Sequence, residues 1–127
     1  MRALVVDDSR TMRRIVANVL EGLGFSTTQA ADGQEALDAL QQEGAVDLVT
    51  VDWNMPVMDG LELVTHVRKN REWRGVTLMM VTTEAEQSQI VRALAAGAHE
   101  YLIKPFTAEE LRAKLDLLGL VPVEETA

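Results

Sequence analysis

The sequence contains no cysteine and only three prolines, and aromatic residues make up 4% of its 127 positions. Without cysteine the fold has no disulfides, and nothing indicates an oxidising compartment. No apolar run approaches the roughly 20 residues of a membrane span. The first such run, residues 3–6, is stopped by Asp7 and Asp8 and is far too short for a signal peptide, so we expect none. We therefore expect a cytoplasmic protein that does not contact the membrane.

Basic residues are also scarce, because twelve Lys and Arg stand against twenty Asp and Glu, a formal net charge of −8. An acidic field repels phosphate backbones, so nucleic acid is not an expected partner. The hydrophobic content of 47% is enough for one compact domain with its own core. We expect a single domain over residues 1–119, followed by a short acidic tail, residues 120–127, with no output domain.

Short β-branched segments alternate five times with longer segments of helical periodicity. The predicted strands are residues 3–6, 25–30, 46–51, 76–81 and 101–103. The periodic apolar positions of the predicted helices are Met12, Ile15, Val16, Val19, Leu20 and Leu23; Ala36, Leu37 and Leu40; Leu61, Val64 and Val67; Ile90, Val91 and Leu94 on one side of a helix over 84–96; and Leu111, Leu115 and Leu118, closed by Gly119 and Pro122. The alternation predicts an α/β fold: one doubly wound, five-stranded parallel sheet with five helices. The uncharged strand 76–81 is expected to be central, and Thr107 and Glu110 have capping-box spacing.

Polar residues follow four of the predicted strands. Asp7 and Asp8 follow the first, Asp52 the third, Thr82 the fourth and Lys104 the fifth. Right-handed crossovers bring the carboxyl ends of parallel strands to one edge of the sheet, where open α/β sheets bind ligands. Three carboxylates in one pocket repel each other unless a cation intervenes, and a ligand set of oxygens alone suits Mg²⁺. The sequence therefore predicts a magnesium site.

Asp52 stands alone at its strand end and is the best candidate for a nucleophile, because Mg²⁺ is commonly held by only one or two carboxylates. Lys104 and the Thr82 hydroxyl are suited to bind the other oxygens of an incoming phosphoryl group, which predicts an aspartyl phosphate. Each residue alone has an ordinary explanation, such as capping of the first helix by Asp8 or Ser9. Their coincidence at one sheet edge favours the functional interpretation.

Five motifs make the sequence similar to the receiver domain of two-component response regulators, most closely to chemotaxis regulators of the CheY type. The motifs are Val5-Val6-Asp7-Asp8-Ser9, Thr11-Met12-Arg13-Arg14-Ile15, Asp52-Trp53-Asn54-Met55-Pro56, Met58-Asp59-Gly60-Leu61-Glu62-Leu63 and Lys104-Pro105-Phe106-Thr107. The resemblance covers about residues 3–118. It implies the flavodoxin-like topology for which CheY is a known example, with strand order 2-1-3-4-5.

The resemblance also implies roles for the residues at the sheet edge. Asp52 would be the phosphoacceptor, and Lys104 and Thr82 would contact the phosphoryl group. The implied Mg²⁺ ligands are Asp7, Asp8, Asp52 and the main-chain carbonyl of Asn54. The implied donor is a phosphohistidine on a sensor histidine kinase, for which acetyl phosphate can substitute. The domain is then a signalling protein, not an enzyme, that catalyses its own phosphorylation and slow dephosphorylation.

A conformational switch is implied as well. Thr82 would move toward the phosphoryl group, and Tyr101 would turn inward into the vacated space. A new charge would thereby bias a bistable element. The face built from the fourth helix, the fifth strand and the fifth helix would change and bind a downstream protein.

Three further positions, Asn54, Thr83 and Glu84, are expected to tune phosphoryl turnover. Thr83 stands where the family usually has Ala or Gly, so its larger side chain predicts slower turnover. Glu86 and Gln87 stand where the chemotaxis relatives that bind the flagellar motor carry lysines, and like-charge contacts discriminate strongly between partners. The flagellar motor is therefore a doubtful target.

Several alternatives stay open on the residues alone. The chain fits a phosphate sink, a relay, or the detached receiver of a longer regulator. A phosphatase with an aspartate nucleophile would need a second acid two positions after Asp52, where Asn54 stands. A flavin module would need a hydroxyl- and glycine-rich loop after the first strand, where Asp7 and Asp8 place negative charge.

Overall fold

Five parallel strands form one sheet in the order β2-β1-β3-β4-β5 in the computed structural model, which describes residues 1–44 and 46–120. The strands are β1 (Arg2–Val6), β2 (Ser26–Ala30), β3 (Leu48–Val51), β4 (Thr77–Thr82) and β5 (Glu100–Ile103). The helices are α1 (Arg10–Gly22), α2 (Gly33–Glu43), α3 (Gly60–Lys69), α4 (Gln87–Ala96) and α5 (Ala108–Leu117), with a short 3₁₀ turn, η1 (Arg71–Trp73). The predicted α/β fold and strand order are confirmed.

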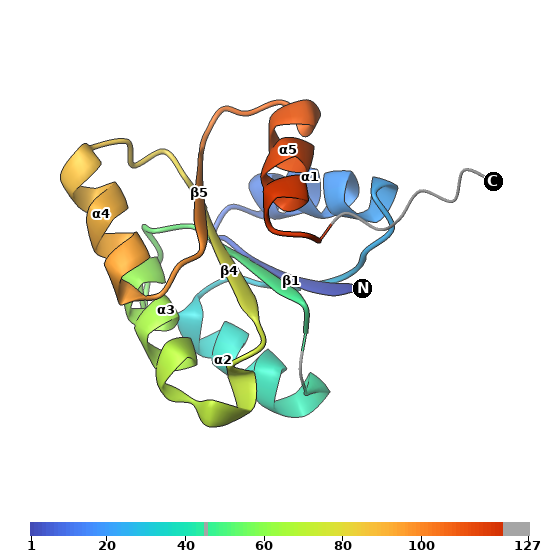
Figure 1. Ribbon diagram of the computed structural model, residues 1–127. Coiled ribbons are helices and arrows are strands. Elements are labelled where there is room, and N and C mark those ends of the chain that lie inside the picture. The colour runs from blue at the N-terminus through green and yellow to red at the C-terminus, as the bar shows by residue number, and fades with distance from the viewer. Residues whose placement is uncertain (45, 121–127) are drawn as a thin grey trace.

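Helices cover both faces of the sheet, with α1 and α5 on one side and α2, α3 and α4 on the other (Figure 1). Alternation along the strands explains the two layers, since neighbouring strand residues point to opposite faces. In β1, Leu4 and Val6 join the cluster under α2 and α3, whereas Ala3 and Val5 join the cluster under α1 and α5. The sequence of a strand that is buried on both faces is therefore a continuous run of apolar residues.

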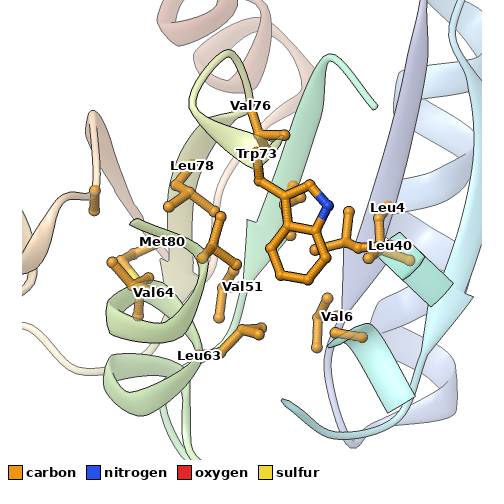
Figure 2. Close-up of a cluster of buried hydrophobic side chains, with 14 of the residues drawn as sticks. Leu4, Val6, Leu40, Val51, Leu63, Val64, Trp73, Val76, Leu78 and Met80 are labelled. Atoms are coloured by element: carbon orange, nitrogen blue, oxygen red, sulfur yellow. The ribbon is translucent and has the colours of Figure 1, made fainter. Parts of the chain in front are cut away.

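Trp73 fills the centre of the larger cluster (Figure 2). The indole is only 5% exposed although it comes from a short connecting turn. Asn70 begins this turn by accepting a hydrogen bond from the Glu72 N–H at 2.8 Å. Figure 2 shows the ring among Leu4, Leu40 and Val76, so the turn closes the core between β1 and α2. The sequence analysis did not anticipate this 3₁₀ turn.

Side-chain caps define where the helices begin. Ser9 caps α1 by accepting from the Met12 N–H at 3.2 Å, and Asp32 caps α2. The predicted capping box at the start of α5 is present, with Thr107 and Glu110 each accepting the other's backbone N–H. Such caps satisfy amide groups that have no partner within the helix. Each helix start after β1, β2 and β5 is thereby set by a local signal in the sequence.

The fourth helix departs from the prediction. It begins at Gln87, not at Glu84, because the backbone of Glu84 is engaged elsewhere: its N–H donates to the Thr82 hydroxyl at 3.3 Å and its carbonyl accepts from the Tyr101 hydroxyl at 2.7 Å. Val91 and Leu94, which periodicity grouped with Ile90, are 57% and 43% exposed. The prediction of a shared buried side was therefore wrong, and Ala93 is the helix's only fully buried residue.

Smaller differences concern the place of β4 in the sheet and two apolar positions of the predicted helices. β3 occupies the middle of the sheet, and β4, expected to be central, is internal between β3 and β5. Ile15 is 44% exposed, and Leu118 is the half-buried C-cap of α5. The predicted closure at Pro122 and most of the acidic tail lie outside the described residues. Within the described part of the chain, no helix combines the length and apolarity needed to cross a bilayer.

Candidate functional site

Side chains that follow three strands meet at one edge of the sheet. Asp7 and Asp8 follow β1 and Asp52 follows β3, and each offers a carboxylate oxygen within 4.8 Å of the others. Lys104 follows β5 and lies against two of these acids. Asp7 is 3% and Asp52 8% exposed, whereas Asp8 is open to solvent. The fold thus brings together the acids that the sequence separates by up to 45 positions.

The two buried carboxylates are held in the same way. One oxygen of each accepts a backbone hydrogen bond at 2.8 Å, Asp7 Oδ1 from the Ser9 N–H and Asp52 Oδ1 from the Trp53 N–H. The other oxygen, Oδ2, faces Lys104, whose Nζ lies 2.7 Å from Asp7 and 3.6 Å from Asp52. Each acid is therefore oriented by its own turn, and one cation links the pair.

Lys104 reaches the acids because β5 ends beside β4. The Lys104 N–H donates to the Thr82 carbonyl at 2.9 Å, which extends the strand pairing by one bond. The peptide bond that follows, between Lys104 and Pro105, is cis. The ammonium group is largely buried, with 11% of its side chain exposed, so its interaction with the acids is poorly screened by water.

Burial raises the pKa of the Asp52 carboxyl above its usual value, and the nearby Asp7 charge adds to the rise. The Thr82 hydroxyl, the Lys104 ammonium and the Trp53 N–H lower the same pKa, but they do not cancel the effect of burial. A carboxylate in this environment is poorly solvated. Ionised Asp52 consequently gains from an added cation and is less hindered as a nucleophile by surrounding water.

A close backbone approach shapes the loop after Asp52. The Gly60 N–H donates to the Trp53 carbonyl at 2.8 Å, and a Cβ at residue 60 would collide with the Asp52 carbonyl. Only glycine permits the start of α3 to lie this near to the site. Val57, in the same loop, has a φ of 68° and is 80% exposed. The motif around Gly60 therefore has a steric reason.

The switch and turnover residues form one hydrogen-bonded group beside the acids. Thr82 is fully buried, and its hydroxyl accepts from the Glu84 N–H. Tyr101 is 6% exposed, so its ring is already turned inward, and its hydroxyl donates to the Glu84 carbonyl at 2.7 Å. Burial, followed by the charges of Glu84 and Asp52, raises the pKa of Tyr101. The Asn54 side-chain amide donates to Glu84 at 3.1 Å.

Thr83 is exposed and lines a largely apolar groove of about 450 Å³ next to Lys104. The other lining residues are Met12, Ile15, Pro105 and Phe106. The groove lies between α1 and the loop that follows β5, and Lys104, which contacts Asp7 and Asp52, forms part of its wall. Helical periodicity predicted that Ile15 is buried in the core, but this exposed side chain lines the surface groove.

One residue at the site was missed by the sequence analysis. The Arg13 guanidinium donates to the Asp7 carbonyl at 2.7 Å and to the Gln29 side chain at 3.3 Å. It ties α1 to the turn that presents Asp7 and to β2. The only sequence signal was its place on the first predicted helix, six residues after Asp7.

The donor chemistry fits a hard divalent cation. Three carboxylates supply oxygens within 4.8 Å of one another, two of them buried, and no sulfur or imidazole belongs to the group. Small hard cations prefer such oxygen ligands and retain several waters, for which exposed Asp8 leaves an open side. Lys104 balances part of the negative charge through the contacts of its Nζ with Asp7 and Asp52.

Comparison with known proteins decides the family. The model of the response regulator receiver domain matches residues 3–116, nearly the whole chain. This chain belongs to the response regulator receiver domain family. The receiver domain is a signalling domain, and receiver domains of the CheY type take phosphate from histidine kinases, generally with Mg²⁺, and act on downstream proteins.

Several relatives are chemotaxis proteins. This receiver domain is 48% identical to chemotaxis protein CheY-3 of Vibrio cholerae over 117 residues, which cover 91% of this chain and 89% of the relative. It is 44% identical to chemotaxis protein CheY of Pseudomonas aeruginosa, with coverage of 91% and 94%. The high-resolution structure of the chemotaxis response regulator CheY4 of Vibrio cholerae superimposes with a TM-score of 0.84 at 38% identity, covering 92% of this chain and 97% of that one. The resemblance inferred from the motifs is confirmed.

Proposed function

We propose that this receiver domain is a chemotaxis response regulator that accepts a phosphoryl group on Asp52 from a phosphohistidine of a sensor histidine kinase. Residues 1–119 act as the receiver unit, and a cytoplasmic location follows from such a donor. The observation that supports the proposal most strongly is the grouping of three carboxylates within 4.8 Å beside a single largely buried lysine. The names of the relatives add the chemotaxis context.

Mg²⁺ is the proposed cofactor. The residues that would hold it are Asp7, Asp8, Asp52 and the main-chain carbonyl of Asn54. When bound, it would neutralise charge on the phosphoryl oxygens and on the acids. The chain's own contribution is to hold Asp7 through the Ser9 N–H and Asp52 through the Trp53 N–H before any ligand arrives. Preorganised charges of this kind contribute most of the catalysis in phosphoryl transfer.

Asp52 is the proposed nucleophile. A carboxylate oxygen forms a bond to phosphorus while the bond between phosphorus and the imidazole nitrogen of the donor breaks, and the leaving imidazole takes up a proton from water. Lys104 donates to one phosphoryl oxygen and the Thr82 hydroxyl to another. Asp52 Oδ2 suits this role because Oδ1 already accepts the Trp53 N–H. Hydrolysis of the acyl phosphate by water later returns the carboxylate and inorganic phosphate.

Turnover of the phosphoryl group is proposed to depend on three residues around the site. Asn54 and Glu84 are joined by a 3.1 Å hydrogen bond beside Asp52, which restricts the path of an attacking water. Thr83 lines the groove beside Lys104 and occupies space there that a smaller residue would leave open. These contacts favour a slowly hydrolysed phosphoryl group.

Output is proposed to pass through Thr82 and Tyr101. Thr82 turns its hydroxyl from the Glu84 N–H to the phosphoryl group, and the Tyr101 ring, inward in this structure, is stabilised in that position. The face that responds consists of α4, β5 and α5, which expose Val91, Leu94 and Ile103 to a downstream protein. Glu86 and Gln87 at the start of α4 disfavour a target that selects for lysines there.

The donor kinase is proposed to dock over the groove lined by Met12, Ile15 and Phe106. This groove opens beside Lys104, so an imidazole presented there can approach Asp52. Arg10 and Arg14 stand exposed on the neighbouring surface of α1 and suit an acidic kinase surface.

Intact-mass measurement tests the proposal. Wild-type protein is mixed with Mg²⁺ and acetyl phosphate, and a gain of one phosphoryl group is expected. No gain is expected when a chelator is present from the start of the reaction. Asp52→Asn should gain nothing, whereas Asp38→Asn, a matched change on the surface of α2, should gain the group normally. An unmodified wild-type chain, or a modified Asp52→Asn chain, would refute the assignment.

A further inference from the structure

Arg92 on α4 covers the indole of Trp53. Its guanidinium carbon lies 5.9 Å from the centroid of the ring, within the range of a cation–π interaction. Gln89, one turn earlier, accepts a hydrogen bond from Arg92 Nη1 at 2.9 Å and thereby restrains the guanidinium. Arg92 is exposed, whereas Trp53 is only 6% exposed, so the arginine forms the outer cover of the indole.

Trp53 is also joined to the candidate phosphoacceptor. Its backbone N–H donates to Asp52 Oδ1 at 2.8 Å, and its carbonyl accepts from the Gly60 N–H. One residue therefore contacts the Asp52 carboxylate through its backbone and α4 through its ring. A change of charge or ligand at Asp52 alters the hydrogen bond that the carboxylate accepts from the Trp53 N–H. A displacement of α4 alters the contact between Arg92 and the Trp53 ring.

The rest of α4 is lightly held. Its N-cap residue, Glu86, makes no side-chain capping bond, and Ala93 is its only fully buried residue. Val91 and Leu94 face solvent instead of the sheet. Ile90 and Ala96 pack against the core but are only partly buried, so one additional contact of modest strength contributes to where the helix lies.

We propose that Arg92 is a positioning residue that couples the state of the Asp52 carboxylate to the placement of α4 through the Trp53 ring. The coupling rests on the proposed function of Asp52. Coupling between two sites is reciprocal, so removal of the Arg92 cation must change how tightly the acid site holds its ligand. Exposed cation–π contacts are weak, and the expected change in affinity is about two- to fivefold.

The test uses Trp53 as its own reporter. The chain has two tryptophans, so a Trp73→Phe parent leaves Trp53 alone to emit. Arg92→Met removes the charge and keeps the stem, Arg92→Lys keeps the charge, and Arg112→Met on α5 is the matched control. Emission is recorded first without metal or phosphate analogue and then during titration with Mg²⁺ and beryllofluoride. The same variants in the wild-type chain replace this series if the Trp73→Phe parent does not fold.

Arg92→Met is expected to shift the ligand-free emission of Trp53 and to change the apparent beryllofluoride affinity two- to fivefold, with Arg92→Lys nearer to the parent and Arg112→Met unchanged. An emission shift without a change in affinity would show a contact without coupling and would overturn the proposal. Equal behaviour of Arg92→Met and Arg112→Met would overturn it as well. If the parent binds beryllofluoride but takes no phosphoryl group from acetyl phosphate, the proposed function is wrong. The change in beryllofluoride affinity then still decides whether Arg92 couples α4 to the acid site.

Discussion

Lys104 lies between two carboxylates but pairs unequally with them: its Nζ is 2.7 Å from Asp7 Oδ2 and 3.6 Å from Asp52 Oδ2. The shorter contact is a hydrogen bond, and the longer one leaves Asp52 room to accept a new group. The lysine is thus held in place by the acid that is not the proposed nucleophile.

Replacing this lysine should lower the rate of phosphorylation while the protein remains folded. Lys104→Met removes the donor to the incoming phosphoryl group, and we expect the rate of phosphoryl uptake from acetyl phosphate to fall by about a hundredfold. Lys104→Arg should recover part of the rate. Lys114→Met, which removes a lysine that pairs with Glu100 on the neighbouring surface, should leave the rate near wild type. A Lys104→Met protein that is folded and fully active would contradict the role of Lys104.

Neutralising Asp52 should stabilise the protein. Since burial raises the pKa of this carboxyl, the folded state favours its neutral form, and ionised Asp52 at pH 7 weakens the fold. Without Mg²⁺, Asp52→Asn is expected to raise the free energy of unfolding, because the neutral amide avoids the cost of burying the charge. Urea denaturation measures the change. Asp8→Asn, at an exposed member of the same cluster, should have a smaller effect, and a destabilised Asp52→Asn would contradict the prediction.

Opening the groove beside Lys104 should speed the loss of phosphate. Thr83→Ala shortens an exposed side chain at the groove wall, and we expect dephosphorylation to become about threefold faster. The decay of intact phosphoprotein after removal of acetyl phosphate measures the rate. Thr65→Ala, on α3, is the matched control. An unchanged decay in Thr83→Ala would reject a role for Thr83 in turnover.

The loop before α3 contains a removable strain. Val57 adopts a φ of 68° while the Met58 N–H donates to the Pro56 carbonyl at 2.7 Å, a tight turn that a β-branched residue rarely occupies. Asn tolerates this conformation better, so Val57→Asn should raise the free energy of unfolding by about 1 kcal/mol. The same change at Val91, exposed on a regular helix, should bring no gain. Thermal unfolding distinguishes the two.

Stability should fall in mild acid because of His99. Burial, followed by the charge of Arg68, lowers the pKa of this histidine below 6.5, and its Nδ1 accepts the Leu78 N–H at 3.1 Å. The unfolded chain then binds the proton more readily, so the contribution of neutral His99 is present above pH 6.5 and is lost as the pH falls below it through the folded pKa. Urea denaturation at a series of pH values should show this slope.

Two substitutions check the assignment to His99. His99→Asn retains an acceptor for the Leu78 N–H and should flatten the slope near pH 6. His66→Asn, at the second histidine, on α3, should preserve the slope. Retention of the full slope in His99→Asn would assign the effect to other groups.

Much of the fold was readable along the chain because its signals are local. Apolar runs for the strands, helical spacing in α1 to α3 and the Thr107–Glu110 capping box depend on neighbouring residues only. The start of α4 was not readable, because it depends on the bond from Tyr101 to the Glu84 carbonyl across 17 positions. The exposure of Val91 and Leu94 likewise depends on how far α4 stands from the sheet.

The order of residues by itself determined which acids follow which strands and, through the single handedness of parallel crossovers, that they gather at one edge. Only the tertiary structure decided which contacts form at that edge. Lys104 lies closer to Asp7 than to Asp52. Arg13 donates to the Asp7 carbonyl, and Arg92 covers Trp53. The reason is that strand pairing sets positions to within a residue, whereas a hydrogen bond or ring contact depends on differences of about an ångström, which arise from packing of the whole chain.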